Sequence, residues 1–162
     1  MQAALAGSVL ALVLDALMLS AGHPSLWRHM GQLGSFFDVQ GRALLHGRLS
    51  VPPASVTIEG FDVAGRTYIY FGPVPALFRI PVLLVTHALD GRLTQLSMLA
   101  ALIVLLWTGA RAHWQVRELI SPGRSVGRTE RPAVFLMAVA LGAGGVPLFL
   151  SSWPVVYHES EL

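Results

Sequence analysis

Three long apolar stretches constrain the fold of this chain more than any other feature of its sequence. The first contains a single charged residue, Asp15, and the other two contain none. A helix needs about 20 mainly apolar residues to cross the hydrocarbon core of a bilayer. We therefore expect three transmembrane helices, over residues 1–22, 93–110 and 132–156.

The composition agrees with a membrane protein and excludes several other classes. Charged residues make up 12% of the 162 residues, whereas soluble domains contain about 25%. The chain has no cysteine, so disulfide frameworks and cysteine nucleophiles are excluded. Its net charge of only +2 gives no support to a nucleic-acid partner.

The distribution of arginine predicts the orientation in the membrane. The loop over residues 111–131 carries five of the eleven arginines and no lysine. Short loops rich in basic residues stay in the cytoplasm. We therefore expect a multi-pass protein of the plasma membrane, with its N-terminus inside and with residues 23–92 and 157–162 outside.

The outer segment over residues 23–92 is too long for a passive connection. Helical spacing of apolar residues predicts a short amphipathic helix over 35–46. Alternation around Ala64-Gly65 predicts a β-hairpin over 55–71. The proline-rich apolar stretch over 75–89 is too interrupted for a span and is typical of an interfacial helix.

The expected fold class is thus an all-α integral membrane protein with a small outer unit of short helices and a hairpin. The third apolar stretch contains Gly142, Gly144, Gly145 and Pro147 near its middle. Such residues predict a kink or a break in that span. Since three helices form only a small bundle, we expect the chain to be part of a larger helical membrane protein.

Asp38 is the first candidate for chemistry. It lies at the start of the predicted outer helix, next to Phe36 and Phe37. A carboxylate beside aromatic rings can act as a general base with a raised pKa. The spacing from Ser35 also matches a capping box, in which Asp38 would only stabilise the helix N-terminus.

Other acidic residues have open interpretations. Glu59 and Asp62 flank Gly60-Phe61 in the predicted hairpin, where they could bind a sugar hydroxyl or a metal, or be exposed carboxylates of a turn. Asp15 lies within the first span. A carboxylate inside a membrane is costly, so it indicates either a function or hydrogen bonding to neighbouring helices.

Several outer residues are candidates for binding a lipid-phosphate ligand. A guanidinium pairs with a phosphate through two hydrogen bonds, and Arg42 and Arg79 lie in the outer segment, together with Arg48 and Arg66. Tyr157-His158-Glu159 ends the third span on the same predicted side. Each also has a structural interpretation, as a snorkelling side chain or an interfacial tyrosine. The histidines show no metal-ligand spacing.

Three strings of the outer segment resemble a known family. They run from Phe36 to Leu49 (FFDVQGRALLHGRL), from Ile58 to Phe61 (IEGF) and from Tyr68 to Pro81 (YIYFGPVPALFRIP). Together they resemble the N-terminal part of actinobacterial multi-pass membrane proteins of the type C glycosyltransferase (GT-C) kind. The resemblance covers residues 30–112, and Tyr157-His158-Glu159 is similar to a later segment of such proteins.

The resemblance implies a fold of about a dozen helices, a polyprenyl-phosphate-sugar donor and a catalytic carboxylate on the first outer loop. It places that carboxylate on Asp38 and brings Arg79 to the donor phosphate. The predicted substrate- or donor-binding residues are Arg42, Arg79, Glu59, Tyr68, Tyr70, His158 and Glu159.

The expected function is therefore transfer of a sugar from this donor to an acceptor of the cell envelope, either a glycan or a protein, by the chain or by a protein of which it is the N-terminal portion. No cofactor is predicted, and the sequence leaves a divalent metal open. Two alternatives remain. One is a non-catalytic membrane scaffold that binds lipid or a partner through Tyr68, Tyr70 and the proline-rich stretch. The other is part of a transporter, suggested by Asp15 and the broken third span.

Overall fold

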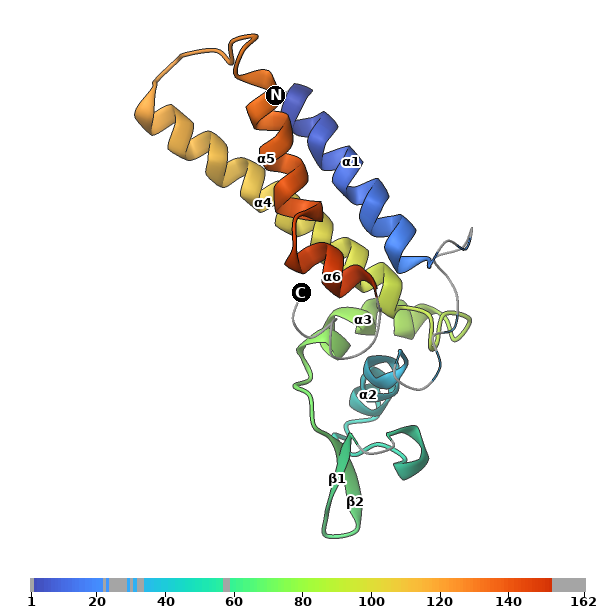
Figure 1. Cartoon of the computed structure of the whole chain (residues 1–162). Coiled ribbons are helices and arrows are strands. Elements are labelled where there is room, and N and C mark those ends of the chain that lie inside the picture. Colours follow the sequence, from blue (N-terminus) through green and yellow to red (C-terminus); the bar gives the residue numbers. More distant parts are fainter. Residues whose placement is uncertain are drawn as a thin grey trace. The chain divides into compact units, whose positions relative to one another are not determined.

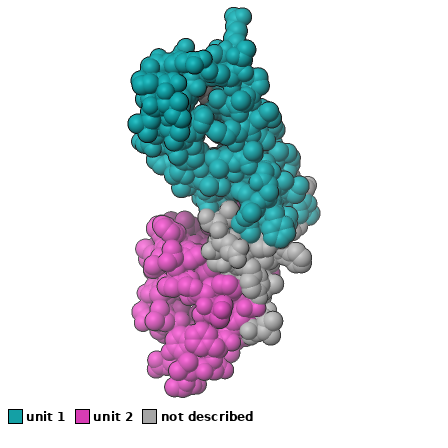
Figure 2. Space-filling view, turned by 60° about the vertical axis from the view of Figure 1, so that its left-hand side comes forward, with its two compact units in different colours: residues 1–24, 98–153, 162 teal, residues 25–97, 154–161 magenta. Residues whose placement is uncertain are grey.

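The computed structural model describes residues 2–21, 23, 29, 31, 34–56 and 59–152. This part of the chain contains six α-helices, one short 3-10 helix and a two-stranded sheet (Figure 1). It divides into two compact units (Figure 2). Unit 1 holds α1, most of α4, α5 and α6, and unit 2 holds α2, the sheet, α3 and the first turn of α4.

Among the described residues, two helices are long and apolar enough to cross a membrane: α1 (Gln2–Leu19) and α4 (Thr94–Ile120). A third span is possible by length if α5 (Arg131–Ala143) and α6 (Val146–Ser152) count as one bent span. These elements correspond to the three apolar stretches of the sequence.

Small residues hold α1 against α5 in unit 1. A Cβ added to Gly7 would lie 2.4 Å from the Phe135 carbonyl oxygen and 2.9 Å from the Ala138 Cβ. One turn further, a Cβ on Gly142 would lie 2.7 Å from the Ala11 Cβ. The two helices run side by side and parallel (Figure 1). Close backbone approach through small residues is the usual packing of membrane helices.

Helix α4 is longer than the sequence predicted. We expected the helix to end before Arg111 and the cytoplasmic loop to begin there, but α4 continues to Ile120. Arg111 ends the apolar run and not the helix, because residues 111–120 include no proline or glycine. The helix ends where Ser121-Pro122-Gly123 follows, with Gly123 at a φ of +68°.

The predicted break of the third stretch is confirmed. Helix α5 ends at Ala143, α6 begins at Val146, and the two axes differ by 41°. Gly145 between them has a φ of +86°, a conformation that favours glycine. Each half is well short of the roughly 30 Å thickness of a bilayer core on its own.

Unit 2 is built around α2 (Phe36–Leu45) and α3 (Val74–Val85), which pack against each other. The apolar side chains buried in its core are Phe36, Phe37, Ala43, Val51, Val56, Ile69 and Ala76. Helix α2 confirms the predicted helix over 35–46. Helix α3 begins one residue earlier than predicted and ends at Val85 instead of residue 89, because Thr86 is extended with a φ of −149°.

The hairpin also forms, with shorter strands than expected. Strand β1 (Gly60–Val63) pairs antiparallel with β2 (Arg66–Ile69). The predicted turn at Ala64-Gly65 is confirmed, and both residues have positive φ, 51° and 74°, as in a type I′ turn. Residues 53–55, which follow the extended Pro52, form the 3-10 helix, so the strand does not begin at residue 55.

Candidate functional site

A buried ion pair joins α2 to α3 in unit 2. Arg79 Nη1 lies 2.5 Å from Asp38 Oδ1, and both side chains are almost wholly buried. The second carboxylate oxygen, Oδ2, accepts a hydrogen bond of 2.5 Å from the Gly91 backbone N–H. Both oxygens of Asp38 are therefore occupied by donors, from segments 41 and 53 residues away in the sequence.

The guanidinium of Arg79 has further partners at the start of α4. Its Nη2 donates to the Thr94 hydroxyl at 2.9 Å and to the Ser97 hydroxyl at 3.2 Å. The Thr94 hydroxyl in turn donates a hydrogen bond of 2.6 Å to the Gly34 carbonyl oxygen. The Arg79 Cζ atom lies over the Phe37 ring, 5.6 Å from the ring centroid. This arrangement adds a cation–π contact. Arg79 is thus held in one orientation by groups on two segments, α2 and the start of α4.

Burial and pairing shift the pKa of Asp38 in opposite directions. Loss of water around the carboxylate raises the pKa of Asp38 above its ordinary value, while the charge and hydrogen bond of Arg79 and the Gly91 N–H lower it, with a net upward shift. A carboxylate with a raised pKa is a stronger base than an exposed one. Strongly perturbed groups next to a specific charge partner are typical of functional sites, although structural ion pairs also show them.

The capping interpretation of Asp38 does not describe its contacts. Ser35 occupies the N-cap position of α2, and no side chain caps that end with a hydrogen bond. Asp38 lies in the first turn, where its charge suits the positive end of the helix dipole. Its two oxygens are directed to Arg79 and Gly91, and so its main contacts are tertiary.

Arg42 forms a second connection across unit 2, separate from the first. Its Nη2 and Nε donate to the two oxygens of Asp90, at 2.7 and 3.1 Å. Its remaining donors reach the carbonyl oxygens of Leu83 and, at 2.6 Å, of Thr86. These carbonyls belong to the last turn of α3 and the residue after it. Arg42 therefore caps the C-terminal end of α3, and its predicted role in donor binding stays a prediction.

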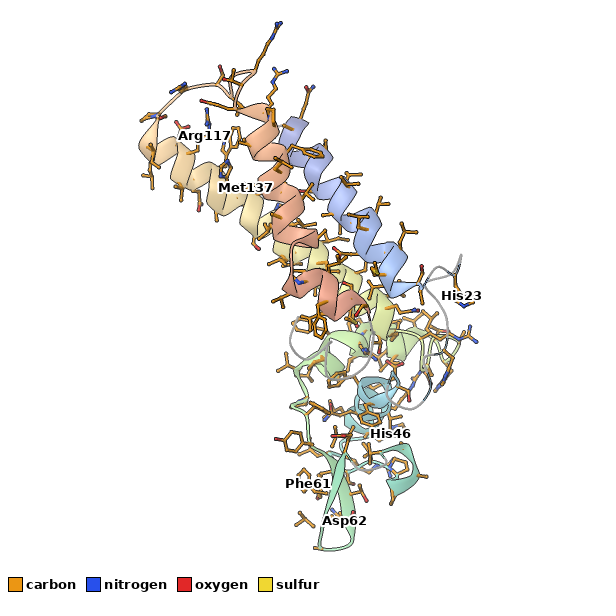
Figure 3. All side chains as sticks on the ribbon, in the orientation of Figure 1. His23, His46, Phe61, Asp62, Arg117 and Met137 are labelled. Atoms are coloured by element: carbon orange, nitrogen blue, oxygen red, sulfur yellow. The ribbon has the colours of Figure 1, made fainter. Side chains whose placement is uncertain are left out.

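The other predicted site residues lie away from this pair or outside the described part of the chain. Tyr68 is on β2, where its ring stacks on Phe61 with centroids 5.8 Å apart. Tyr70 is 76% exposed, and Glu59 precedes β1 and accepts the Tyr70 N–H through its backbone carbonyl. Figure 3 labels Phe61 and Asp62 on the hairpin. His158 and Glu159 lie outside the described residues.

Asp15 is buried in unit 1. It lies on the same stripe of α1 as Gly7, Ala11 and Leu19, all of which are buried. Neither of its carboxylate oxygens has a hydrogen-bond partner within the described residues. The Ser151 hydroxyl of α6 interacts with the Asp15 carboxyl. It donates its hydrogen bond to the Pro147 carbonyl oxygen, at 2.9 Å.

Sequence reasoning missed four residues of these networks: Asp90, Gly91, Thr94 and Ser97. Thr94 and Ser97 are three residues apart and therefore share one face of α4. The sequence does show polar residues at the start of an apolar helix, which indicate a polar contact there. Their spacing alone does not identify Arg79 as the partner. Among the described residues, no group of three or more His, Cys, Asp or Glu side chains could hold a metal ion.

Comparison with protein-family models, with curated proteins and with solved structures finds no match for this chain.

Proposed function

We propose that this chain is a membrane glycosyltransferase, or the N-terminal portion of one, that transfers a sugar from a polyprenyl-phosphate donor to an acceptor of the cell envelope. The observation that carries the proposal is the ion pair between Asp38 and Arg79. It brings together a carboxylate that could serve as base and a guanidinium that could bind phosphate, the two groups that such a reaction needs.

In the proposed reaction, Asp38 removes the proton from an acceptor hydroxyl while that oxygen attacks the anomeric carbon of the donor. The bond from that carbon to the phosphate oxygen breaks, the lipid phosphate leaves, and the sugar configuration inverts. The proton ends on the Asp38 carboxylate. The upward shift of the Asp38 pKa caused by burial supports its use as a base.

Arg79 has two functions in this proposal. Before the donor arrives, it neutralises Asp38 and keeps the carboxylate in place. A donor phosphate competes for the same guanidinium, and an arginine binds phosphate through two parallel hydrogen bonds. When Arg79 turns to the phosphate, Asp38 loses its main counter-charge and becomes available to the acceptor. The closed pair is then the resting state of the site.

The test compares single and double variants of the pair in membranes that contain the complete gene product. The assay follows transfer from radiolabelled polyprenyl-phosphate sugars, and the variants are Asp38→Asn, Arg79→Gln and the double variant. Single variants leave an uncompensated buried charge and lower stability as well as activity. The double variant removes both charges, and we expect it to recover most of the stability and none of the activity.

A double variant that recovers both stability and transfer would show that the pair is only structural, and the scaffold alternative would take precedence. Arg48→Gln is the matched control, because Arg48 is an exposed arginine of the same segment. We expect it to retain full transfer. Loss of transfer in that control would indicate a general requirement for positive charge and would contradict a specific role of Arg79.

A transporter is the second candidate, and the specific observation in its favour is Asp15. A buried carboxyl without a hydrogen-bond partner among the described residues of an apolar helix is a functional candidate by default. The adjacent break between α5 and α6 resembles the discontinuous helices that form transport sites. Proton flux into vesicles that contain the protein, compared between wild type and Asp15→Asn, tests it; equal fluxes would remove the candidate.

A further inference from the structure

A cavity in unit 1 has no role in the proposed reaction. It is a partly open cavity of about 330 Å³, lined by residues of α1, α4 and α5, and its volume is within the range of ligand pockets. Its apolar wall includes Ala4, Leu106, Ala110, Met137 and Leu141. Figure 3 labels Met137 on α5 and Arg117 on α4, two of the three helices that border it.

Part of the lining of this cavity is polar or aromatic. Trp107, Arg111, His113 and Trp114 of α4 line it, and the Arg111 guanidinium lies 5.1 Å from the centre of the Trp107 ring. The His113 Nε2 atom is buried and has no hydrogen-bond partner within the described residues. Tryptophan and arginine gather where a membrane helix meets the headgroup layer.

A second cavity, of about 560 Å³, shares one lining residue, Trp114, with the first. It is bordered by Arg131 at the start of α5 and by Gln2 of α1. Arg111 of α4 lines the first cavity, and Arg131 of α5 lines the second. Both side chains are exposed, and neither forms an ion pair within the described residues.

The acidic residues nearby in the sequence are already engaged. Glu130 pairs with Arg117 at 3.0 Å and with Arg124 at 3.1 Å. Glu118 accepts a hydrogen bond of 2.9 Å from the Gly123 N–H. The positive charge of Arg111 and Arg131 therefore remains for an external anion. An apolar cavity with uncompensated arginines at its mouth fits a molecule with an acyl chain and an anionic headgroup.

We propose that these two cavities bind one anionic phospholipid. One of its two acyl chains fills the apolar cavity between α1, α4 and α5, the other stays in the surrounding bilayer, and its phosphate lies between Arg111 and Arg131. Trp107 and Trp114 hold the glycerol region. Basic pockets between membrane helices are a known kind of lipid site. This inference is independent of the proposed glycosyl transfer, because it uses none of the residues around Asp38.

The test uses the two tryptophans of the site as reporters. A background variant with Trp27→Phe and Trp153→Phe leaves Trp107 and Trp114 as the only tryptophans. The protein is placed in phosphatidylcholine vesicles that contain increasing fractions of brominated phosphatidylglycerol or brominated phosphatidylcholine, which quench tryptophan on contact. We expect half-maximal quenching at a roughly tenfold lower fraction of the anionic lipid, because each arginine near a membrane surface adds to its binding.

Two changes of the site separate its charge from its shape. The double variant Arg111→Gln/Arg131→Gln should lose the preference for phosphatidylglycerol, and Ala110→Leu, which fills the apolar cavity, should weaken quenching by the anionic lipid. Arg128→Gln is the matched control: an arginine of the same basic loop that lines neither cavity.

Equal quenching by the two lipids would overturn the proposal. So would a preference that survives the double variant, or one that falls equally with Arg128→Gln, because both indicate general surface charge. Protection of both tryptophans from either lipid would show that a protein helix fills the cavity, which also overturns it.

Discussion

Asp38 on α2 and Arg79 on α3 form an ion pair of 2.5 Å in the interior of unit 2, although 41 residues separate them in the sequence. Two buried charges lose much of their hydration, so such a pair depends on its geometry and on further hydrogen bonds. Here Gly91, Thr94 and Ser97 supply those hydrogen bonds.

The pair predicts strong coupling between the two residues. Asp38→Asn or Arg79→Gln alone should lower the free energy of unfolding by about 3–5 kcal/mol, because each leaves the other charge buried without a partner. The double variant should cost clearly less than the sum of the two. Thermal unfolding of the four proteins in detergent measures this, and additive losses would contradict the coupling.

Arg42 should not tolerate lysine. Its guanidinium reaches both oxygens of Asp90 and two carbonyl oxygens at the end of α3, and an ammonium group cannot reproduce this planar arrangement. We expect Arg42→Lys to lower the free energy of unfolding by about 1–3 kcal/mol. Arg48→Lys, at an exposed position, should stay within about 0.5 kcal/mol of wild type. Equal effects would exclude a specific role for Arg42 at α3.

Gly7 should be sensitive even to alanine. The added methyl group would meet the Phe135 carbonyl oxygen at 2.4 Å, so α1 and α5 would have to move apart. Overpacking of this kind costs about 1–3 kcal/mol. Thermal unfolding should show the loss for Gly7→Ala, while Ala6→Leu, on an exposed position of the same helix, should have little effect. An unchanged melting temperature for Gly7→Ala would argue against this packing.

The geometry of the hairpin turn predicts two substitutions with opposite effects on the free energy of unfolding. Ala64 has a φ of +51° and Gly65 a φ of +74°, and asparagine followed by glycine is the preferred pair in such turns. Ala64→Asn should raise the free energy of unfolding by about 0.5 kcal/mol, and Gly65→Ala should lower it by about 1 kcal/mol. Chemical unfolding of both variants checks the signs; the same sign for both would rule out this turn.

The contacts of Glu130 predict that the stability of the segment before α5 depends on pH. The Gly127 N–H, with Arg117 and Arg124, holds the pKa of Glu130 below its ordinary value of 4.5. A lowered pKa in the folded state adds stability above pH 4.5, and that stability is lost as the pH falls through the folded value. Hydrogen exchange of residues 121–131, corrected for intrinsic rates, should therefore speed up in acid. In Glu130→Gln this change should be absent.

Local features of the fold could be predicted from the sequence. The break between α5 and α6 follows from Gly144 and Gly145, and the hairpin turn from Ala64-Gly65, because the conformational preferences of a few adjacent residues decide each of them. The end of α4 could not be read from the charge pattern. A charged residue limits how far an apolar run extends, but the helix continues until proline and glycine interrupt its hydrogen bonds.

The candidate site was predictable only in part. Asp38 and Arg79 could each be selected from their surroundings in the sequence, but their pairing depends on how α2 packs on α3. Arg42 shows the limit more clearly. Its charge suggested a phosphate ligand, whereas its donors reach Asp90 and the end of α3. A guanidinium suits an internal carboxylate as well as an external phosphate, and the choice between them is made by tertiary structure.

The position of the hairpin turn gives the protein a convenient place for a reporter. Both Ala64 and Gly65 are exposed, and neither the Asp38–Arg79 pair nor the Arg42–Asp90 pair involves β1 or β2. A short epitope inserted between these two residues would therefore leave both pairs intact. Antibody access to that epitope in whole cells, compared with permeabilised cells, would reveal directly on which side of the membrane unit 2 lies.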